Sequence, residues 1–216
     1  MRIGILGSGG VGQALGTRLA NLGHDVTLGA REAANPRVVL WAEAHDARCG
    51  TFADAAAGAE LVINATAGQH SVAAVELAGG NPAFAGTVLL DVSNPIDISD
   101  SGLRLTVVNT DSVGERLQRA LPDARVVKSL NTVNGTVMVE PTLVPGHHTM
   151  FVAGDDDAAK ATVTGLLREF GWPEEDILDL GGIVEARAME MYLPLWISIM
   201  KATGGNLAFN INVVLG

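Results

Sequence analysis

The chain has 216 residues, of which 48% are hydrophobic and 18% are charged, and its formal net charge is -10. A chain of this length and composition can bury the core of one large domain, which excludes an intrinsically disordered protein. The acidic balance argues against a surface that binds nucleic acid or an anionic membrane, so we expect partners of neither kind.

Strand-like and helix-like segments alternate from the N-terminus. Short runs of branched apolar residues are typical of strands, whereas apolar residues every three or four positions, followed by a glycine, indicate a helix that ends there. We therefore expect a strand at 3–6, a helix at 11–22, a strand at 25–30, a helix at 36–45 and a short strand at 48–51. No apolar leader precedes the first strand and Cys49 is the single cysteine, so we expect a cytoplasmic protein without an internal disulfide.

The same alternation continues to the end of the chain. Unbroken aliphatic runs at 60–65 and 87–92 are typical of buried parallel strands. The further expected elements are helices at 71–78 and 111–121, strands at 125–129 and 149–153, a helix at 158–170 and a long helix at about 183–203. This order predicts an α/β fold: a doubly wound, mainly parallel sheet over residues 1–154, followed by a small C-terminal helical portion at 155–216.

The stretch GILGSGGVGQALG contains a G-x-G-x-x-G motif formed by Gly7, Gly9 and Gly12. The motif follows the first expected strand and opens the first expected helix, which is the context of a Rossmann-type dinucleotide site. We expect Gly7 to permit the tight turn, Gly9 to let a pyrophosphate approach the backbone, and Gly12 to let the helix pack on the sheet. The free N–H groups at the helix start complete an anion site. The expected cofactor-binding residues of this loop are Gly7, Ser8, Gly9, Gly10, Val11 and Gly12.

The second expected strand ends at Gly29-Ala30-Arg31. Sites that prefer NAD place an acid at this point to bind the ribose hydroxyls, whereas an arginine can pair with the 2′-phosphate of NADP. Glu32 follows one residue later and could reach a ribose instead. The pattern favours NADP(H), with Ala30 and Arg31 in the site.

Two more loops leave the carboxyl ends of expected strands, where ligands bind in such folds. In the first loop, Ala65 leaves room for the cofactor and Thr66 can donate to a phosphate. His70 in the same loop is either a catalytic acid or a histidine that caps the next helix or faces solvent. In the second loop, Asn94 can hydrogen-bond the nicotinamide carboxamide while Pro95 fixes the turn, unless the pair is a plain Asn-Pro turn.

Three other features carry weaker signals. Lys128 ends an expected strand and is either a catalytic proton donor or phosphate contact, or a structural or solvent-facing lysine. His147 and His148 are adjacent, so their side chains point apart, and we expect no metal site. Arg187 and Glu190 have the i, i+3 spacing of an ion pair on one helix.

Several segments, in their order along the chain, resemble the coenzyme F420-dependent NADP oxidoreductases. They are the glycine loop, Gly29-Ala30-Arg31, VVKSLNTV at 126–133, VAGDDDAAK at 152–160 and ARAMEMYLPLWISIMK at 186–201. The chain is also similar to the NADPH-binding domain of the six-transmembrane metalloreductases, which shares the glycine loop and a Lys-x-x-Asn-Thr stretch.

The resemblance implies a Rossmann domain that holds NADP and a small C-terminal part that holds a deazaflavin over the nicotinamide. It also implies that four residues, Ser93, Asn94, Pro95 and Asn131, lie near the nicotinamide. The chain departs from the type members at Asn131-Thr132-Val133, where they carry a histidine.

These observations favour an NADP(H)-dependent oxidoreductase that exchanges hydride with a deazaflavin (F420) or a flavin. Hydride exchange between two rings needs contact and exclusion of water, not necessarily a protein acid. One alternative is an NADPH-dependent reductase of a small carbonyl or imine, for which Lys128, His70 or Asp91 would be the proton donor. Another is a non-catalytic, redox-sensing protein that binds NADP(H).

The expected helix at 183–203 is apolar nearly all round, and the tail at 206–215 is apolar enough to be buried. A lone chain would expose a large apolar patch there, whereas a two-fold homodimer covers the patch on both subunits at once. We therefore expect a homodimer, with Trp196 or its neighbours at or near the interface and the helix walling the second substrate's pocket.

Overall fold

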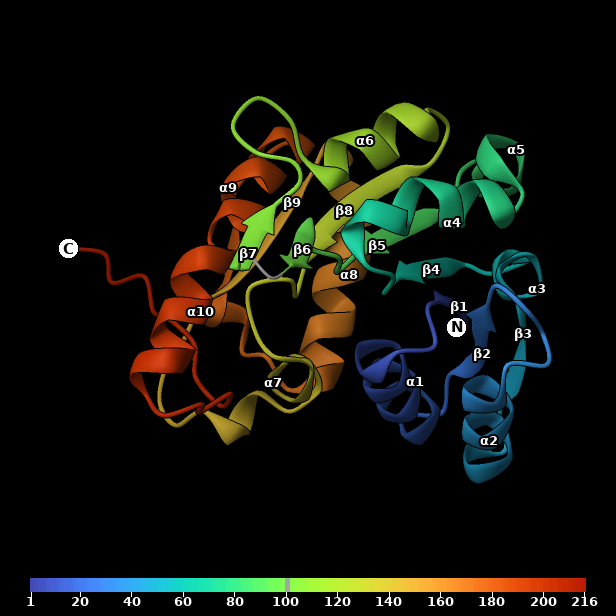
Figure 1. The fold of residues 1–216 in the computed structure, drawn as a ribbon, viewed down its shortest axis with the longest axis horizontal. Coiled ribbons are helices and arrows are strands. Elements are labelled where there is room, and N and C mark those ends of the chain that lie inside the picture. The colour runs from blue at the N-terminus through green and yellow to red at the C-terminus, as the bar shows by residue number, and fades with distance from the viewer. Residues whose placement is uncertain (100–101) are drawn as a thin grey trace.

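A computed structural model describes residues 1–99 and 102–216 and shows a central eight-stranded sheet (Figure 1). The strand order is β10-β9-β8-β5-β4-β1-β2-β3. The strands are β1 (Arg2–Leu6), β2 (Asp25–Ala30), β3 (Arg48–Thr51), β4 (Leu61–Asn64), β5 (Val88–Asp91), β8 (Arg125–Ser129), β9 (Met150–Gly154) and β10 (Ile177–Asp179). Neighbouring strands are parallel except β8 and β9, which are antiparallel. The chain therefore has the doubly wound, mainly parallel α/β fold that the sequence predicts.

Helices cover both faces of the sheet (Figure 1). One face packs against α1 (Gly10–Asn21), α2 (Pro36–His45), α7 (Gly135–Val139) and α8 (Asp157–Phe170). The other face packs against α3 (Phe52–Ala56), α4 (Ser71–Leu77), α5 (Gly80–Phe84), α6 (Val113–Ala120) and the start of α9 (Ala186–Met191). Along β4 the side chains alternate between these layers, Leu61 and Ile63 facing one and Val62 the other. Because this strand is buried on both faces, Leu61, Val62 and Ile63 are all apolar and the sequence shows no polar alternation before Asn64.

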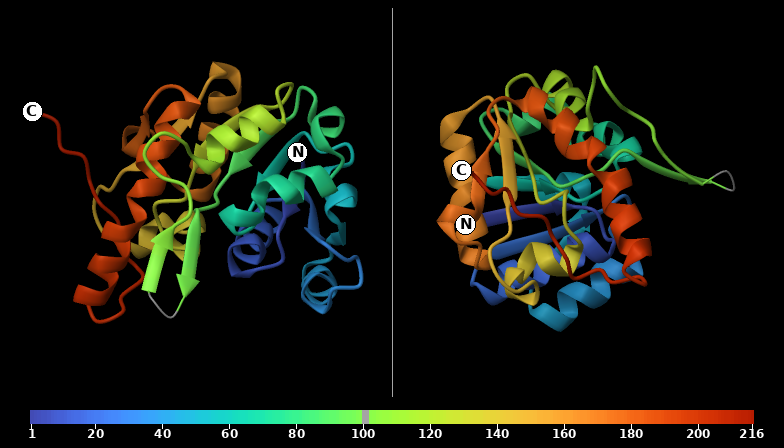
Figure 2. Two further views of the ribbon diagram at one scale, coloured as in Figure 1. Left: turned by 45° about the horizontal axis from the view of Figure 1, so that its top comes forward. Right: turned by 90° about the vertical axis from the view of Figure 1, so that its left-hand side faces the viewer.

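The long regular elements lie where the sequence predicts them, within two residues at each end. Shorter elements had no periodic signal to reveal them, because they contain too few residues to show a helical or strand period. Among these are α3, α5, α7, β10 and a hairpin of β6 (Ile96–Ser99) and β7 (Gly102–Leu105). The hairpin projects from the body of the molecule (Figure 2).

The C-terminal part differs from expectation in two ways. The strand β10 adds to the main sheet beside β9, so the sheet continues past residue 154. The expected helix at 183–203 is divided into a 3₁₀ turn at Ile183–Glu185, then α9, then α10 (Leu193–Ala202). Pro194 lies in the first turn of α10, where its missing N–H is tolerated, whereas within a continuous helix it would remove a hydrogen bond.

The tail after α10 is an extended arm laid against the start of β9 (Figure 2). Thr149 donates its N–H to the carbonyl of Ile211 at 2.8 Å, and its hydroxyl accepts from the N–H of Val213 at 2.9 Å. In a single chain the end of the tail is open to solvent, with Val214 and Leu215 84% and 81% exposed, so its expected burial depends on a second subunit. No helix of the described part is both long and apolar enough to cross a bilayer.

Candidate functional site

The glycine loop between β1 and α1 has the geometry that its sequence predicts. Gly7 adopts a φ of +127°, and a Cβ there would lie 2.6 Å from the carbonyl oxygen of Ala65. A Cβ at Gly12 would lie 2.0 Å from the carbonyl oxygen of Gly7. Both positions therefore require glycine for the turn and for helix packing. A Cβ at Gly9 would meet nothing within 4 Å, because that position faces open space.

The N-terminus of α1 is ready to bind an anion. Gly9 is the N-cap, no side chain caps the helix, and its first turn contains no acid. The first helical hydrogen bond runs from the N–H of Gln13 to the carbonyl of Gly9, at 3.0 Å. The N–H groups of Gly10, Val11 and Gly12 precede that bond, and the positive end of the helix dipole lies with them.

Two cavities meet at this helix start. The arginine cavity, of about 620 Å³, runs from the glycine loop to the end of β2. It is lined by residues that include Gly7, Ser8, Gly9, Ala30, Arg31, Glu32, Asn35 and His70. The asparagine cavity, of about 350 Å³, lies on the other side of the helix start. The cavities share Gly9, Ala65, Thr66 and Ala67, so together they form one cleft at the N-terminus of α1.

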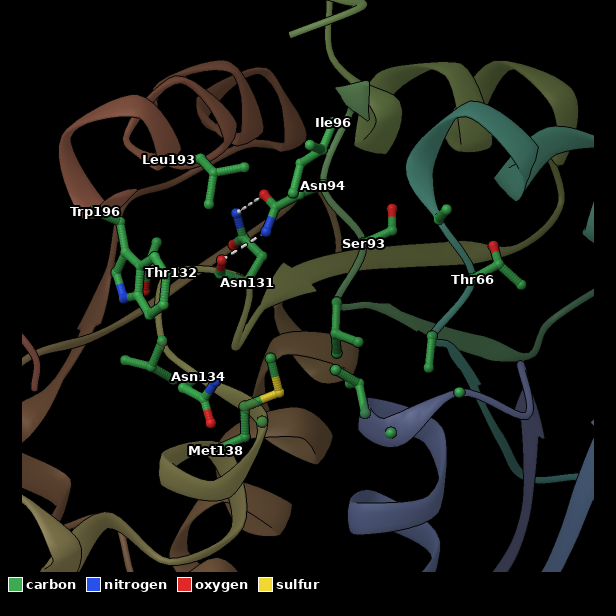
Figure 3. A pocket seen from close by; sticks show the side chains of 18 residues that line it. Thr66, Ser93, Asn94, Ile96, Asn131, Thr132, Asn134, Met138, Leu193 and Trp196 are labelled. Atoms are coloured by element: carbon green, nitrogen blue, oxygen red, sulfur yellow. Dashed lines mark hydrogen bonds between the residues drawn. The ribbon is translucent and has the colours of Figure 1, made fainter. Parts of the chain in front are cut away.

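A pair of asparagines dominates the wall of the asparagine cavity (Figure 3). The amide of Asn94 donates to the carbonyl of Asn131 at 2.8 Å, and the amide of Asn131 donates to Oδ1 of Asn94 at 3.0 Å and to the carbonyl of Met189 at 3.1 Å. Leu130, directly before Asn131, is fully buried and has a φ of +64°, which is strained for a branched residue. The loop after β8 is thus held in a defined and costly conformation.

Several buried polar atoms around the asparagine cavity have no hydrogen-bond partner within the described part of the protein. They are Ser93 Oγ, Asn131 Oδ1, Thr132 Oγ1 and Trp196 Nε1, all from residues that line the cavity. Ser93, Asn131 and Thr132 are each at most 3% exposed. Buried polar atoms are nearly always paired in folded proteins, so this concentration at one cavity indicates a polar ligand.

The asparagine cavity has no ionisable side chain in its wall, as far as the described residues go. Its polar groups are amides, hydroxyls and an indole, and its apolar groups include Ile96, Met138 and Leu193. Leu193 and Trp196 come from α10 and lie on one side of the asparagine pair, with Thr66 on the opposite side (Figure 3). Trp196 is stacked on Phe209 of the tail with ring centroids 5.0 Å apart.

Lys128 lines neither cavity. Its ammonium is fully buried and donates to Asp91 Oδ2 at 2.8 Å, to the carbonyl of Ser93 at 2.6 Å and to Glu190 Oε1 at 2.8 Å. Burial acts to lower the pKa of this ammonium, but the carboxylates of Asp91 and Glu190 outweigh it and hold the pKa above its usual value. The geometry therefore favours the structural interpretation of Lys128 over the catalytic one.

The polar network extends from Asp91 toward Thr66. Asp91 Oδ1 accepts from the amide of Asn64 at 2.8 Å and from the N–H of Ser93 at 3.1 Å. The Oδ1 atom of Asn64 in turn accepts from the hydroxyl of Thr66 at 2.7 Å. The carboxyl ends of β4, β5 and β8 are thereby tied together, and the loops that line the cleft start from fixed positions.

Two other expected features have different surroundings from those the sequence suggests. His70 is exposed and lines the arginine cavity, not the asparagine cavity. The ion pair expected between Arg187 and Glu190 is wrong: Arg187 Nε donates to Glu115 of α6 at 2.8 Å. Glu190 instead faces Lys128 and accepts from the N–H groups of Val113 and Gly114 at the start of α6.

His147 and His148 bind different partners. His147 pairs with Asp176 at 3.0 Å, whereas His148 contacts the carbonyl of Pro141 and the side chain of Asn210. No group of three or more His, Cys, Asp and Glu residues able to hold a metal ion occurs in the described part of the chain.

Some cavity residues were not among the site residues expected from the sequence. Thr132, Asn134, Met138 and Leu193 line the asparagine cavity. Their positions relative to the glycine loop depend on how β8, α7 and α10 meet α1. The signal that could have indicated Thr132 and Asn134 is their place just after a strand end, where ligands bind in such sheets.

The chain is similar to known NADP-linked proteins over nearly its whole length. Residues 2–95 match the family described as NADP oxidoreductase coenzyme F420-dependent. The F420-dependent NADP reductase of Methanothermobacter marburgensis is 30% identical over 211 residues, which cover 92% of each chain. A solved structure from Arthrobacter sp. FB24, assigned as an F420-dependent NADP reductase, is 44% identical, covers 100% of both chains and has a TM-score of 0.92.

Two further similarities cover only part of the matched protein. The metalloreductase STEAP3 of Rattus norvegicus is 29% identical over 199 residues, which are 90% of this chain and 38% of that protein. The chain thus spans about two fifths of that relative's length. An imine reductase of Aspergillus terreus in complex with NADPH4 shares the fold, with 23% identity and a TM-score of 0.66 over 94% of this chain and 63% of that one.

Proposed function

Since the chain belongs to the family of coenzyme F420-dependent NADP oxidoreductases, we propose that it transfers hydride between NADP(H) and a deazaflavin or flavin. In this proposal the dinucleotide lies along the cleft, with its 2′-phosphate at Arg31 and its nicotinamide in the asparagine cavity. The second ring lies over the nicotinamide, beside Leu193 and Trp196 of α10.

The observation that carries this proposal is the absence of an ionisable side chain from the described wall of the asparagine cavity. Reduction of a carbonyl or an imine needs a proton donor within hydrogen-bond reach of the reacting atom. Hydride transfer between two ring systems needs contact geometry and exclusion of water instead. The cavity offers the second set of conditions.

The residues of the cleft fit a bound NADP(H). Gly9 leaves open space where a pyrophosphate would approach. The uncapped N–H groups of Gly10 and Val11 lie at the positive end of the α1 dipole and can donate to it there. Arg31 is exposed at the far end of the arginine cavity, where its planar guanidinium suits a phosphate. The unpartnered Ser93 Oγ and Asn131 Oδ1 offer hydrogen bonds to a carboxamide.

When bound, the nicotinamide supplies the hydride or accepts it. The chain's own residues orient the partners and keep water out. Asn94 and Asn131 hold each other and so fix the loops after β5 and β8. Met138, Leu193 and Trp196 provide apolar walls that limit the access of water.

An acceptor assay with isotopic tracing tests the proposal. The protein is mixed with NADPH that carries deuterium at nicotinamide C4, and each acceptor is supplied separately: a deazaflavin of F420 type, FMN, a simple carbonyl and a cyclic imine. We expect the deazaflavin or the flavin to be reduced, with the deuterium recovered in the deazaflavin product. The same assay with a Gly9→Val variant controls for reduction without the site.

Other outcomes of this assay would contradict the proposal. Reduction of only the carbonyl or the imine would show a different class of substrate. Tight NADPH binding without turnover of any acceptor would favour a non-catalytic, redox-sensing protein.

A further inference from the structure

A fully buried ion pair holds the backbone of Ser93, a residue that lines the asparagine cavity. Lys128 Nζ donates to the carbonyl of Ser93 at 2.6 Å. Asp91 accepts from the same ammonium through Oδ2 at 2.8 Å, and from the N–H of Ser93 through Oδ1 at 3.1 Å. The peptide groups on both sides of Ser93 are therefore bound to this one pair of charges.

The sheet explains why Lys128 and Asp91 meet at this point. Asp91 is the last residue of β5, and Lys128 is its register partner on the neighbouring strand β8. Both side chains are 0% exposed, so water does not compete for their hydrogen bonds. Hydrogen bonds to charged groups are roughly twice as strong as neutral ones. The backbone of Ser93 is thus held more firmly than neutral partners would hold it.

The side chain of Ser93 is left unpaired by these contacts. Its Oγ atom is buried and has no hydrogen-bond partner among the residues that the structure describes, and the residue is 3% exposed. Ser93 lies between the asparagine pair and Thr66 along the cavity (Figure 3). A buried hydroxyl without a partner costs free energy, which a bound polar group would recover. Since the backbone is fixed, only the side-chain torsions of Ser93 remain to adjust to that group.

We propose that Lys128 and Asp91 are positioning residues for the dinucleotide: through the backbone of Ser93 they place its hydroxyl to hydrogen-bond the carboxamide of the nicotinamide. This inference rests on the proposed function, because it requires the nicotinamide to lie in the asparagine cavity. It goes further by giving the ion pair an effect on ligand binding. Lys128 lines neither cavity, so it exerts this effect only by way of Ser93.

Two ligands that differ only in the nicotinamide test the contact of Ser93. Calorimetric titration gives the Kd of NADP⁺ and of 2′-phospho-ADP-ribose, which keeps both phosphate groups and the second ribose but lacks the nicotinamide. Ser93→Ala should weaken NADP⁺ by about three- to tenfold, the value of one net hydrogen bond. The Kd of 2′-phospho-ADP-ribose should stay within about twofold, because Ser93 does not meet that part of the ligand.

A double-mutant cycle tests the positioning step. An amide has one accepting oxygen where the carboxylate has two, so Asp91→Asn removes the acceptor from Lys128 or from the N–H of Ser93. Asp91→Asn should weaken NADP⁺ by at least about threefold and leave 2′-phospho-ADP-ribose within about twofold. In the presence of Ser93→Ala it should cause no further loss, because the two residues act through one contact. Independent effects on NADP⁺ would multiply instead.

Two further variants guard against a loss of stability as the cause. Leu117→Ala removes core packing on α6 away from both cavities, so it should lower the unfolding midpoint and leave both Kd values within about twofold. If Asp91→Asn does not fold, Lys128→Arg takes its place in the cycle. It keeps the charge, but a planar guanidinium cannot donate in the same three directions, so the same selective loss is expected.

Three results would overturn the inference. They are equal effects of Ser93→Ala on the two ligands, an Asp91→Asn protein that binds NADP⁺ as the unmutated protein does, and losses that multiply in the double variant. These titrations contain no acceptor, so they are separate from the test of the proposed function. If a deazaflavin or flavin is reduced but Ser93→Ala binds NADP⁺ normally, the function stands and the inference fails. If the cycle behaves as expected but neither is reduced, the inference stands and the function fails.

Discussion

Lys128 and Glu190 form an ion pair that is closed to water: their Nζ and Oε1 atoms are 2.8 Å apart, and the side chains are 0% and 1% exposed. The pair joins strand β8 to helix α9, and Glu190 extends the link to the N–H groups of Val113 and Gly114 at the start of α6. The C-terminal helices are thereby fixed to the sheet. The positions of Leu193 and Trp196 at the cleft depend on this connection.

Removal of the Lys128 charge should destabilise the protein strongly. Lys128→Met leaves the carboxylates of Asp91 and Glu190 buried without their partner, so we expect the free energy of unfolding to fall by about 3–5 kcal/mol. Urea unfolding of the variant measures the change, and Lys201→Met is the exposed control. If Lys128→Met does not fold, Glu190→Gln is measured instead and should cost less, since an amide oxygen remains to accept from α6. A loss below about 1 kcal/mol for Lys128→Met would contradict the structural role.

Arg31 should determine the choice of dinucleotide. We expect NADPH to bind at least about tenfold more tightly than NADH, which corresponds to about 1.4 kcal/mol, and Arg31→Ala to remove most of that preference. Calorimetric titration with both nucleotides measures the effect. Arg168→Ala is a matched control, because Arg168 pairs with Glu174 away from both cavities. Equal affinities of the unmutated protein for NADPH and NADH would contradict the assignment of Arg31 to the 2′-phosphate.

Gly9 should be essential for binding but not for folding. A Cβ at this position meets nothing within 4 Å in the protein itself, so Gly9→Val should keep its unfolding midpoint. The valine would occupy the space where the pyrophosphate approaches, so dinucleotide binding should be lost. Gly165→Val is the control, since a Cβ at Gly165 also meets open space but on α8. Unchanged NADPH affinity in a folded Gly9→Val protein would show that the phosphate lies elsewhere.

Leu130 offers a test of strain in the loop after β8. Leu130→Ala loses core packing and keeps the positive φ of 64°, whereas Leu130→Gly loses one carbon more and relieves the strain. We expect the glycine variant to be more stable than the alanine variant by about 1 kcal/mol. The order should reverse at the buried Leu117 of α6, where glycine costs about 1 kcal/mol more than alanine. If the alanine variant is more stable than the glycine variant at Leu130 as well as at Leu117, Leu130 is not strained.

The exposed apolar residues of the C-terminus bear on assembly. Leu195 and Met191 on the C-terminal helices, and Val214 and Leu215 in the tail, are exposed in a single chain. We expect a homodimer that covers them, so light scattering at micromolar concentration should report about twice the 22.3 kDa chain mass. A chain that stays monomeric, and that keeps full activity after removal of residues 206–216, would refute this prediction.

The sequence predicted the main elements well because their signals are local. The strand at Asp25–Ala30 and the helix at Pro36–His45 have the expected bounds, since Val26, Thr27 and Leu28 favour a strand and an early proline marks the start of the helix. The side chain of Asp156 accepts from the N–H of Ala159 at 2.7 Å and so caps α8, which is a local signal for the start of that helix. The hairpin of β6 and β7 was not expected, because four-residue strands show no usable period.

The ion pair expected between Arg187 and Glu190 was wrong because spacing along a helix shows only which residues are able to meet. Glu115 lies 72 residues before Arg187 and competes for it from another helix. A bidentate contact with that carboxylate takes the guanidinium, while Glu190 is drawn into the buried pair with Lys128. Which partner wins depends on how α6 and α9 pack, and no local pattern records that.

Local sequence signals specify the doubly wound fold, the glycine turn at Gly7, Gly9 and Gly12, and the arginine that follows β2. These features follow from backbone conformation and periodicity within a few residues, where propensity acts directly. The burial of Lys128 with Glu190, 62 residues away, and the pairing of Asn94 with Asn131, 37 residues away, arise only in the folded chain. Such pairings arise when separate strands and helices pack, and burial then makes an unpaired polar group too costly to leave without its partner.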